Sequence, residues 1–307
     1  LAPGLLHGDG VAGEYHIKAG GMRTPRAYYA CKVNSSFFGN RTSNGLPNIQ
    51  GLILLYDAAD GRPLAVMESA EITIKRTGAS TAVAARYLAR ENARRVTIAG
   101  AGDQAGIQLE ALARVRQLDQ VFVWTRNEAK GREFAARMRA KLNLDVQFYP
   151  DLSTAARGSD IVVTCTPAKR WFLGRTMISA GTFVAGIGAD SADKQELEPE
   201  LLAAASVVTD LTEQSTHVGD LHHAIVAGLM RRSDVRGELG QIIIGTVPPR
   251  RDDQEIIVFD ATGITQLRIT KYIITRQTES YSAKVEYAPN DDNRFTFSHL
   301  KTEFNDF

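Results

Sequence analysis

One short segment limits the folds open to this chain more than any other. Residues 96–99 form an apolar run, a turn of small residues follows it, and an amphipathic pattern typical of a helix begins at about Gln104. A strand, a turn and a helix in this order bring backbone N–H groups and the positive end of the helix against a phosphate. The segment therefore predicts a pyrophosphate-binding turn. Its residues are Gly100, Ala101, Gly102, Gln104 and Ala105.

The turn gains weight from the sequence around it. Ala105 stands where the usual fingerprint has a third glycine, and the motif tolerates this change because the position serves close helix packing. By itself the pattern also fits a glycine turn in an unrelated α/β protein. However, apolar strand-like runs alternate with helix-like segments after it, which predicts an α/β fold with one Rossmann-type, doubly wound parallel sheet. The runs cover 94–100, 120–126, 145–150, 160–166, 181–188, 206–211 and 255–263, and helices are expected at 104–116 and 129–142.

The residues before this region follow a different period. Three β-rich runs at 14–20, 26–34 and 51–58 are separated by turn segments, which predicts an antiparallel sheet. A helix-like segment at 71–91 leads out of it, and we place the domain boundary near Arg76. The expected domains are 1–75, 76–263 and 264–307, the last of them polar and aromatic without a helix period. Because the chain begins with Leu1, the loss of earlier elements of the first lobe stays open.

Charge and cysteine usage narrow the class of partner. The net charge is +1, so no strong field recruits nucleic acid or an anionic membrane, and a small-molecule partner is expected. The two cysteines, Cys31 and Cys165, match no metal-ligand spacing and fit a reducing cytoplasm. No apolar run reaches the length of a membrane span. The adjacent His222 and His223, expected in a loop entering a helix, lack ligand partners at suitable spacing, so no metal is expected.

The ends of the later strands predict the rest of the dinucleotide site. After the second strand come Thr125, Arg126 and Asn127, with no carboxylate to bind a ribose 2′-hydroxyl. Arg126 stands where a 2′-phosphate would need it, which favours NADP(H) over NAD(H); a solvated charge at a strand end is the alternative. Further candidates follow other strands, with Cys165 expected to be a packing residue rather than a nucleophile. These candidates are Thr164, Cys165, Thr166 and Gly263.

Several segments together resemble the ornithine cyclodeaminase and mu-crystallin family, over about residues 14–263. They occur in the family's order and read YYACKVNSSFFGN, GLPNIQGLILLYDAADGRPLAVME, ITIKRTGASTAVAARYLA, GAGDQA, GIGADSADKQEL and FDATG. Members place a Rossmann domain inside a split lobe that binds substrate and forms a dimer, and many are homodimers. The resemblance therefore implies a Rossmann-type sheet inserted in a split α+β substrate and dimerisation lobe, NADP or NAD as cofactor, and a homodimer.

Three residues take family roles by this resemblance: Lys32 and Asp190 as catalytic residues and Arg76 as the carboxylate-binding arginine. Lys32 lies in an apolar, small-residue strand, where an unpaired ammonium is costly unless it faces an anion, although an edge-strand lysine facing water is the alternative. Arg76 opens a helix in our interpretation, so its planar fork would grip a carboxylate beside the helix N-terminus. Asp190 follows a strand at the sheet edge where ligands bind, although aspartate is also a common helix cap.

The sequence departs from the family at two places. Members usually have a substrate-binding arginine upstream of the lysine, and the nearest candidate here is Lys18, with His16 beside it. A lysine ammonium is a point charge, whereas an arginine guanidinium can donate two parallel hydrogen bonds to a carboxylate. The way in which the substrate carboxylate is bound is therefore expected to differ. Members also continue after the DATG motif with a small-residue helix, whereas residues 264–307 do not resemble it.

The resemblance implies chemistry on a small, cationic L-amino acid or a cyclic imine. Hydride transfer from the α-carbon to NAD(P) would give an imine, which a side-chain amine attacks with loss of ammonia before the hydride returns. The alternatives are net reduction of a ketimine or net oxidation of an amino acid. A binding protein without turnover is a further alternative, which the joint presence of Lys32, Arg76 and Asp190 disfavours.

Overall fold

The computed structural model describes residues 4–23, 25–262, 278–290 and 293–304. The chain divides into two compact units, Leu1–Arg268 and Ile269–Phe307. The second unit contains one antiparallel hairpin, β16 (Thr278–Asn290) and β17 (Asn293–Phe304). Its register shifts after Tyr287, next to Pro289, which has no N–H to donate to the ladder. The sequence predicted no helix in these residues and did not predict the hairpin.

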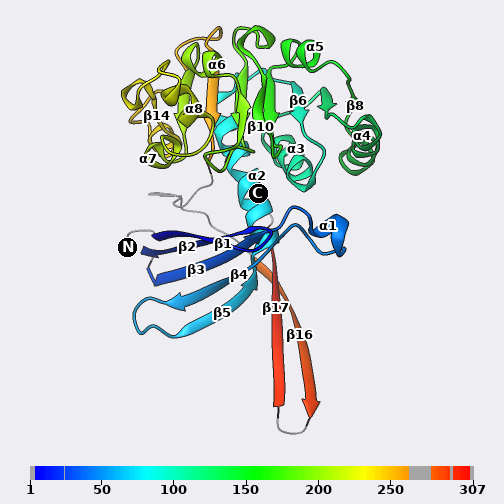
Figure 1. Ribbon diagram of the computed structural model, residues 1–307, viewed down its shortest axis with the longest axis vertical. Coiled ribbons are helices and arrows are strands. Elements are labelled where there is room, and N and C mark those ends of the chain that lie inside the picture. The colour runs from blue at the N-terminus through cyan, green and yellow to red at the C-terminus, as the bar shows by residue number, and fades with distance from the viewer. Residues whose placement is uncertain (1–3, 24, 263–277, 291–292, 305–307) are drawn as a thin grey trace. The chain divides into compact units, whose positions relative to one another are not determined.

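The first unit begins with a five-stranded antiparallel sheet (Figure 1). Three of its strands were predicted, whereas β1 and β5 were not, because the first is glycine-rich and the second is short. The short helix α1 (Asn40–Ser43) lies between β3 and β4. The strands, which pair in chain order, are β1 (Gly4–Asp9), β2 (Glu14–Arg23), β3 (Ala27–Ser36), β4 (Ile49–Asp57) and β5 (Pro63–Glu68).

An eight-stranded parallel sheet follows and confirms the predicted fold class. Its spatial order is β14-β13-β15-β11-β9-β6-β7-β8, so the chain reverses direction across the sheet between β6 and β9. Ligands of open α/β sheets bind at such a switch point, beyond the carboxyl ends of the strands. The strands are β6 (Arg95–Ala99), β7 (Gln120–Trp124), β8 (Val146–Phe148), β9 (Ile161–Thr164), β11 (Phe183–Gly186), β13 (Ser206–Thr209), β14 (Gly237–Glu238) and β15 (Ile257–Asp260). A separate parallel pair joins β10 (Lys169–Leu173) and β12 (Gln195–Leu197).

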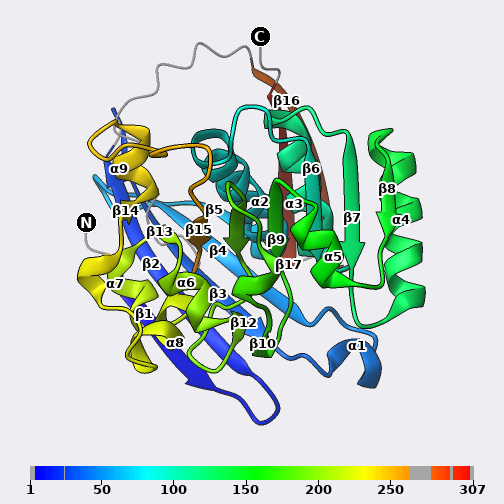
Figure 2. The same ribbon diagram turned by 90° about the horizontal axis from the view of Figure 1, so that it is seen from above.

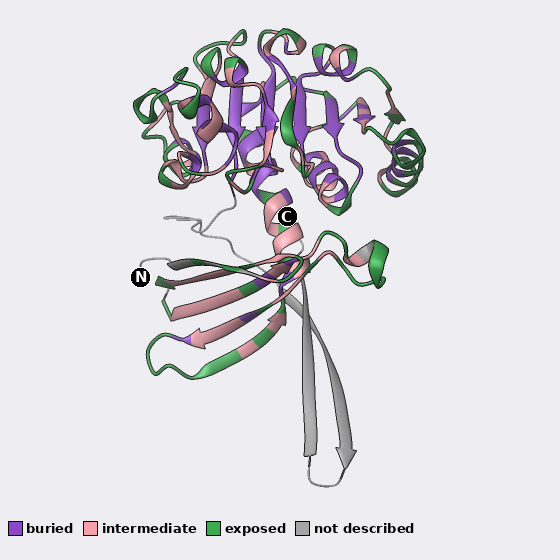
Figure 3. Cartoon of the chain, viewed as in Figure 1, coloured by how far each residue is buried: buried purple, intermediate pink, exposed green. Residues whose placement is uncertain are grey.

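Helices cover both faces of this sheet (Figure 2). One face packs on α2 (Ser69–Leu88), α3 (Asp103–Val115), α4 (Glu128–Leu142) and α9 (Leu239–Ile243). The other packs on α5 (Leu152–Arg157), α6 (Pro199–Ala203) and α8 (Asp220–Val226). The short helix α7 (Thr212–Ser215) follows β13. The buried strands explain the near-continuous apolar runs of the sequence, and Figure 3 shows them as the most buried part of the unit.

The long helix α2 connects the two sheets of the first unit. The Glu68 side chain caps its first turn by accepting from the amides of Ala70 and Glu71. Near its start α2 contacts β3 and β4, and further along it contacts α3, α9 and β11. The proposed domain boundary near Arg76 therefore lies inside a continuous helix. No helix in the described part of the chain is long and apolar enough to cross a membrane.

Candidate functional site

The predicted pyrophosphate turn lies at the switch point of the parallel sheet. Gly100 has a φ of 144°, and a Cβ there would lie 2.8 Å from the Cys165 Sγ, so the close approach of the loops after β6 and β9 requires glycine. A Cβ on Gly102 would meet nothing within 4 Å. Packing therefore explains Gly100 but not Gly102, whose open side fits the approach of a ligand. Gly100 also donates its amide to the Trp124 carbonyl, which joins the turn to β7.

The start of α3 fits an anion. Its N-cap residue is Gly102, which offers no side-chain oxygen to the first amides of the helix. Ala105 is fully buried and packs in the core beneath the turn, as the prediction from helix packing requires. Gln104 is half-buried in the first turn, and its Oε1 has no hydrogen-bond partner among the described residues. The turn thus has the backbone shape and the exposed helix end that a dinucleotide pyrophosphate needs.

The three residues after β7 have different surroundings. Asn127 caps α4, since its Oδ1 accepts from the Lys130 amide at 3.0 Å. Thr125 packs with its methyl group towards Gly131. Arg126 is exposed at the tip of the strand. A 2′-phosphate contact therefore stays a prediction for Arg126. The Asn127 side chain is already used to cap α4.

The residues at the end of β9 range from buried to half-buried. Burial, followed by the charge of Glu196, raises the pKa of the Cys165 thiol well above its ordinary value, so it is held as a thiol and not as a nucleophilic thiolate. Thr164 is fully buried. Thr166 donates both its amide and its hydroxyl to Glu196 Oε1, at 2.6 and 2.7 Å. Gly263, the remaining cofactor candidate, lies outside the described residues.

The second half of the site is a concentration of positive charge on the inner face of the antiparallel sheet. Lys18 and Lys32 are direct partners across β2 and β3. Like charges directly opposite each other destabilise a sheet unless an anion lies between or above them. Burial, then the charges of Arg76 and Lys18, lower the pKa of Lys32 to about 7, and Asp190 acts in the opposite direction. Burial also lowers the pKa of Lys18, with Arg76 as the next cause.

Helix α2 holds the third cation near this pair. Ser69 donates to Asn34 at 2.6 Å in a buried contact that fixes the start of α2 on β3, and Lys32 Nζ lies 3.5 Å from the Thr73 hydroxyl one turn later. Arg76 follows on the next turn, and burial lowers its pKa. Our expectation that Arg76 opens the helix was wrong: α2 begins at Ser69, two turns earlier, because Glu68 provides the cap. The helix N-terminus therefore does not assist this arginine.

Asp190 reaches the same region from the loop after β11. Its charge acts on Lys18, Lys32 and Arg76 alike. The carboxylate is exposed on 56% of its side chain and accepts from Lys194 Nζ at 2.5 Å. Lys194 in turn lies 5.3 Å from the centre of the Phe38 ring, which follows β3. The aspartate is thus partly open to solvent.

A second carboxylate of the site was missed by the sequence analysis. Asp210 follows β13, and burial raises its pKa while bonds from Leu211 and Thr262 and the charge of Arg76 lower it. Its Oδ2 is buried and has no hydrogen-bond partner among the described residues. The signal was available, because Asp210, like Asp190, follows an apolar strand of a parallel sheet. The apolar run predicts a strand at 206–211 but does not mark its aspartate as a site residue.

The paired histidines are in helix α8 and not in a loop. His222 and His223 bond through ring nitrogens to the carbonyls of Thr216 and Lys194, at 3.0 and 2.9 Å. In the described residues no group of three or more histidine, cysteine, aspartate or glutamate side chains could hold a metal ion. These two rings therefore serve to join α8 to neighbouring loops.

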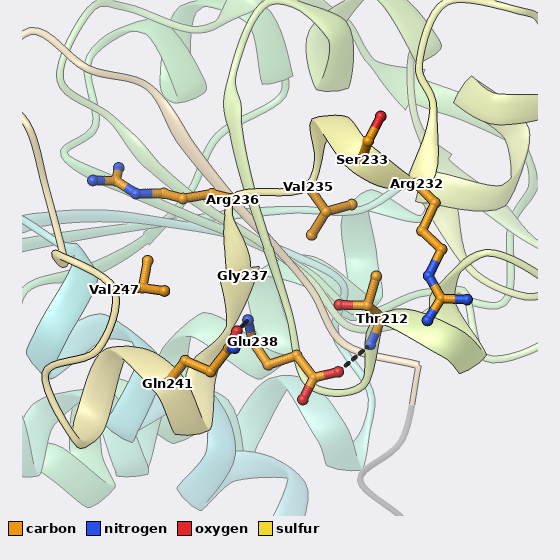
Figure 4. Close-up of a pocket in the computed structure, with 9 residues that line it drawn as sticks. All are labelled: Thr212, Arg232, Ser233, Val235, Arg236, Gly237, Glu238, Gln241 and Val247. Carbon is orange, nitrogen blue, oxygen red and sulfur yellow. Dashed lines mark hydrogen bonds between the residues drawn. The ribbon is translucent and has the colours of Figure 1, made fainter.

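A hollow of about 670 Å³ lies elsewhere, beside β14 and α9 (Figure 4). Its charged groups already have partners: Arg232 pairs with Glu213, Arg236 with Glu255 at 2.9 Å, and Glu238 accepts from the Thr212 amide at 2.9 Å. None of the predicted site residues lines it. Its charges are consistent with a structural role, so we place the candidate site at the switch point and the inner face of the antiparallel sheet.

The fold is that of a dinucleotide-binding α/β protein, with buried cations gathered where its antiparallel sheet meets helix α2. The chain belongs to the ornithine cyclodeaminase/mu-crystallin family, whose model matches residues 21–278. It is 35% identical over 238 residues to an alanine dehydrogenase of Archaeoglobus fulgidus, covering 77% of this chain and 72% of that protein.

Two solved structures extend this similarity. An archaeal alanine dehydrogenase dimer with bound NAD has a TM-score of 0.79 and 32% identity, with 85% of this chain and 80% of that chain covered. The Thermococcus litoralis Δ1-pyrroline-2-carboxylate reductase, in complex with NADH and L-proline, has a TM-score of 0.78 and 29% identity, with 86% and 81% covered. The family resemblance inferred from the sequence is confirmed.

Proposed function

We propose that the protein is an NAD(P)-dependent enzyme that interconverts a small L-amino acid and its imine by hydride transfer at the α-carbon. The observation that carries this proposal is the direct pairing of Lys18 with Lys32, close enough to Arg76 for its charge to help lower both lysine pKa values. Three desolvated cations cost free energy unless an anion joins them, and the α-carboxylate of an amino acid or imino acid is such an anion. The relatives act on molecules of this class, as their names state.

The dinucleotide would lie across the switch point, with its pyrophosphate on the turn at Gly100–Ala105 and its nicotinamide half towards the loops after β9 and β11. The open side of Gly102 and the uncapped start of α3 support this placement. When bound, the cofactor accepts or donates the hydride. Relatives were solved with NAD and NADH, whereas Arg126 favours NADP(H), so the preference of this chain rests on Arg126 alone.

The chain's own residues would perform the rest of the reaction. Arg76, Lys32 and Lys18 hold the carboxylate, and Lys32 also polarises the imine. In the oxidative direction Asp190 takes a proton from the α-ammonium, so that the neutral amine can lose its α-hydrogen as hydride and become an iminium ion. In the reductive direction these transfers reverse. Asp210, buried beside Arg76 and Lys18, offsets part of their charge.

Cyclodeamination is the second candidate, with the same residues and no net redox change. It requires a second ammonium on the substrate, which Asp190 would bind. The charge of the site argues against it. Asp190 is already paired with Lys194, and Asp210 is the one other carboxylate named in the site. The remaining cations are Lys18, Lys32 and Arg76. This excess of positive charge favours a neutral or acidic amino acid over a dicationic one, and hence net reduction or oxidation.

The apolar outer face of the antiparallel sheet supports the proposal of a homodimer. A cross-strand row runs through Leu6, Ile17, Val33 and Leu52, on the face opposite Lys18 and Lys32. Leu6, Val33 and Leu52 are exposed by 66%, 36% and 52%. A second copy would cover this row. Light scattering should give twice the mass of the chain, and Leu52→Arg should give a monomer; a monomeric wild-type protein contradicts the proposal. A cytoplasmic location is also part of the proposal, because the two cysteines, Cys31 and Cys165, fit a reducing compartment.

The decisive experiment offers the purified protein alanine, proline, ornithine, lysine and a cyclic ketimine with each cofactor, and follows the near-ultraviolet absorbance of the reduced nicotinamide. A net change identifies a dehydrogenase or reductase. A product without net change identifies a cyclodeaminase. Binding without any product identifies a non-catalytic binding protein and overturns the proposal.

A further inference from the structure

Glu196 is a buried carboxylate that the mechanism above does not use. It is fully buried in β12, one strand of the separate pair outside the main sheet. Burial raises its pKa, and bonds from Thr166 and Gly188 oppose that effect. A fully buried carboxyl group away from any cation is costly, and it persists only where its oxygens are well hydrogen-bonded.

Its two oxygens bind two different loops. Oε1 accepts from the amide and the hydroxyl of Thr166, at 2.6 and 2.7 Å, and Oε2 accepts from the amide of Gly188 at 2.7 Å. Thr166 follows β9 and Gly188 follows β11, which are neighbours in the parallel sheet. A Cβ on Gly188 would lie 2.2 Å from the Thr166 carbonyl oxygen, so the loops are already as close as backbone allows. Glu196 therefore fixes their relative position at the carboxyl edge of the sheet.

Two further carboxylates hold Glu196 in place. Asp220 Oδ1 accepts from the amides of Glu196 and Leu197, at 2.7 and 2.9 Å. Asp260 accepts from the amides of Asp220 and Leu221, at 3.2 and 3.1 Å. The three form a ladder of buried carboxyl groups, each bonded to the backbone of the next, which connects β15 through the start of α8 and β12 to the two loops.

We infer that Glu196 is a positioning residue for the nicotinamide half of the dinucleotide, because it holds at a fixed spacing the two loops against which that half would bind. The inference rests on the proposed function, since it assumes the dinucleotide placement given there. Glu196 itself touches neither cofactor nor substrate. It acts through Thr166 and Gly188, and through Gly188 on the loop that carries Asp190 two residues later.

The test compares two ligands in matched variants. ADP shares the adenosine and both phosphates with NADH but lacks the nicotinamide half. In Glu196→Gln the side-chain nitrogen faces an amide donor, so one loop loses its acceptor. We expect the Kd of NADH to rise about tenfold, the loss of one hydrogen bond to a charged group, while the Kd of ADP changes by less than about twofold. The kcat should fall as well, because Asp190 moves with the loop.

Glu198→Gln is the matched control. Glu198 lies two residues further along and accepts from the Arg175 amide at 2.7 Å, on a loop that does not contribute to the site. This variant should leave both Kd values unchanged. Equal weakening of NADH and ADP in Glu196→Gln, or no weakening of either, overturns the inference. A wild-type protein that binds neither ligand refutes the proposed function instead.

If Glu196→Gln does not fold, the same two Kd values are measured in Glu196→Asp. That variant keeps the charge but is one methylene too short to reach both loops, so the ratio of the two Kd values should again rise. If neither variant folds, Glu196 serves overall stability and the inference is wrong. Thermal unfolding followed by circular dichroism on each variant decides which case applies.

Discussion

The two halves of the candidate site are organised in opposite ways. The dinucleotide half is built from backbone: Gly100 and Gly102 shape the turn, and the carboxylate of Glu196 fixes the loops beyond it. Its loops are fixed by bonds within the protein, while the first amides of α3 stay open to a ligand. The amino-acid half is built from side chains of like charge, with Lys18, Lys32 and Arg76 desolvated together. The shape of the first half is set without its ligand, whereas the second half gathers cations whose mutual repulsion a carboxylate would relieve.

The largest effect should come from the centre of the charged half. Lys32→Met removes a charge that matters most in the transition state, so kcat should fall by about a hundredfold or more, equivalent to roughly 3 kcal/mol. The Kd of the dinucleotide should stay nearly the same, since that half does not depend on Lys32. Thermal stability should hold or rise, because a lysine opposite Lys18 is lost.

A control for Lys32→Met lies on α2. Lys75 has a side chain that is 71% exposed and pairs with Glu71 one turn away. Lys75→Met should leave turnover and cofactor binding unchanged. Near-normal turnover of Lys32→Met would show that Lys32 takes no part in the reaction. It would also contradict the view that the amino-acid half depends on its charged side chains.

Arg76→Lys sharpens the same contrast with a smaller effect. A lysine keeps the charge but loses the planar fork that grips both carboxylate oxygens, so KM should rise about tenfold. The dinucleotide Kd should again be unaffected. Steady-state kinetics with the best amino-acid substrate provide the measurement, and an unchanged KM would mean that Arg76 only balances the charge of Asp210.

The pH dependence of KM probes the charged half without a mutation. The folded-state pKa of Lys32, about 7, lies below its ordinary value, so the ammonium form is disfavoured in the free protein. As the pH rises through about 7, Lys32 loses its proton and its hold on a carboxylate, and KM should rise. Stability should change in the same window: the unfolded chain binds the extra proton between the two pKa values, so stability rises with pH from about 7 towards the ordinary lysine pKa.

In Lys32→Met the rise of KM near pH 7 should vanish. The increase of stability with pH should become smaller without vanishing, because burial also lowers the pKa of Lys18. A wild-type KM that stays constant from about pH 6 to about pH 9 would show that the carboxylate does not depend on the charge of Lys32.

The smallest effect is expected at the rim of the dinucleotide half. Arg126→Asp removes a partner for a 2′-phosphate and adds an acceptor for a 2′-hydroxyl, so the ratio of NADPH to NADH affinity should fall by about tenfold. Turnover with saturating NADH should be preserved. Equal affinity of the unmutated protein for both cofactors would already contradict the role given to Arg126.

The sequence predicted the parts of the fold whose signal is local. Seven of the eight strands of the parallel sheet were recognised because they lie in short apolar runs, most of them buried on both faces. The eighth, β14, has only two residues, Gly237 and Glu238, and no such run. The three residues Lys32, Arg76 and Asp190 were brought together by family resemblance, and the structure places their charges within mutual influence. Gly100 and Gly102 were recognised from their spacing together with the apolar strand before them and the helix pattern after them.

The parts that were missed depend on contacts between distant segments. The pairing of Lys18 with Lys32 is a matter of strand register, which no local pattern fixes. Glu196 belongs to a run of charged residues that reads as a solvated loop, yet hydrogen bonds to Thr166 and Gly188 make it fully buried. Asp210 looks like any aspartate after a strand until the orphaned oxygen beside Arg76 is seen.

The unbroken course of α2 ties the two lobes of the first unit together. Ala84 and Ala85 bury the far part of this helix in the core of the dinucleotide domain, and Ser69 fixes its start on β3 through Asn34. Arg76 lies between these two anchors, about one turn after Thr73, whose hydroxyl lies 3.5 Å from Lys32 Nζ. The cations of the helix and of the sheet therefore share one frame, and we expect a carboxylate to meet a spacing that is set before it binds.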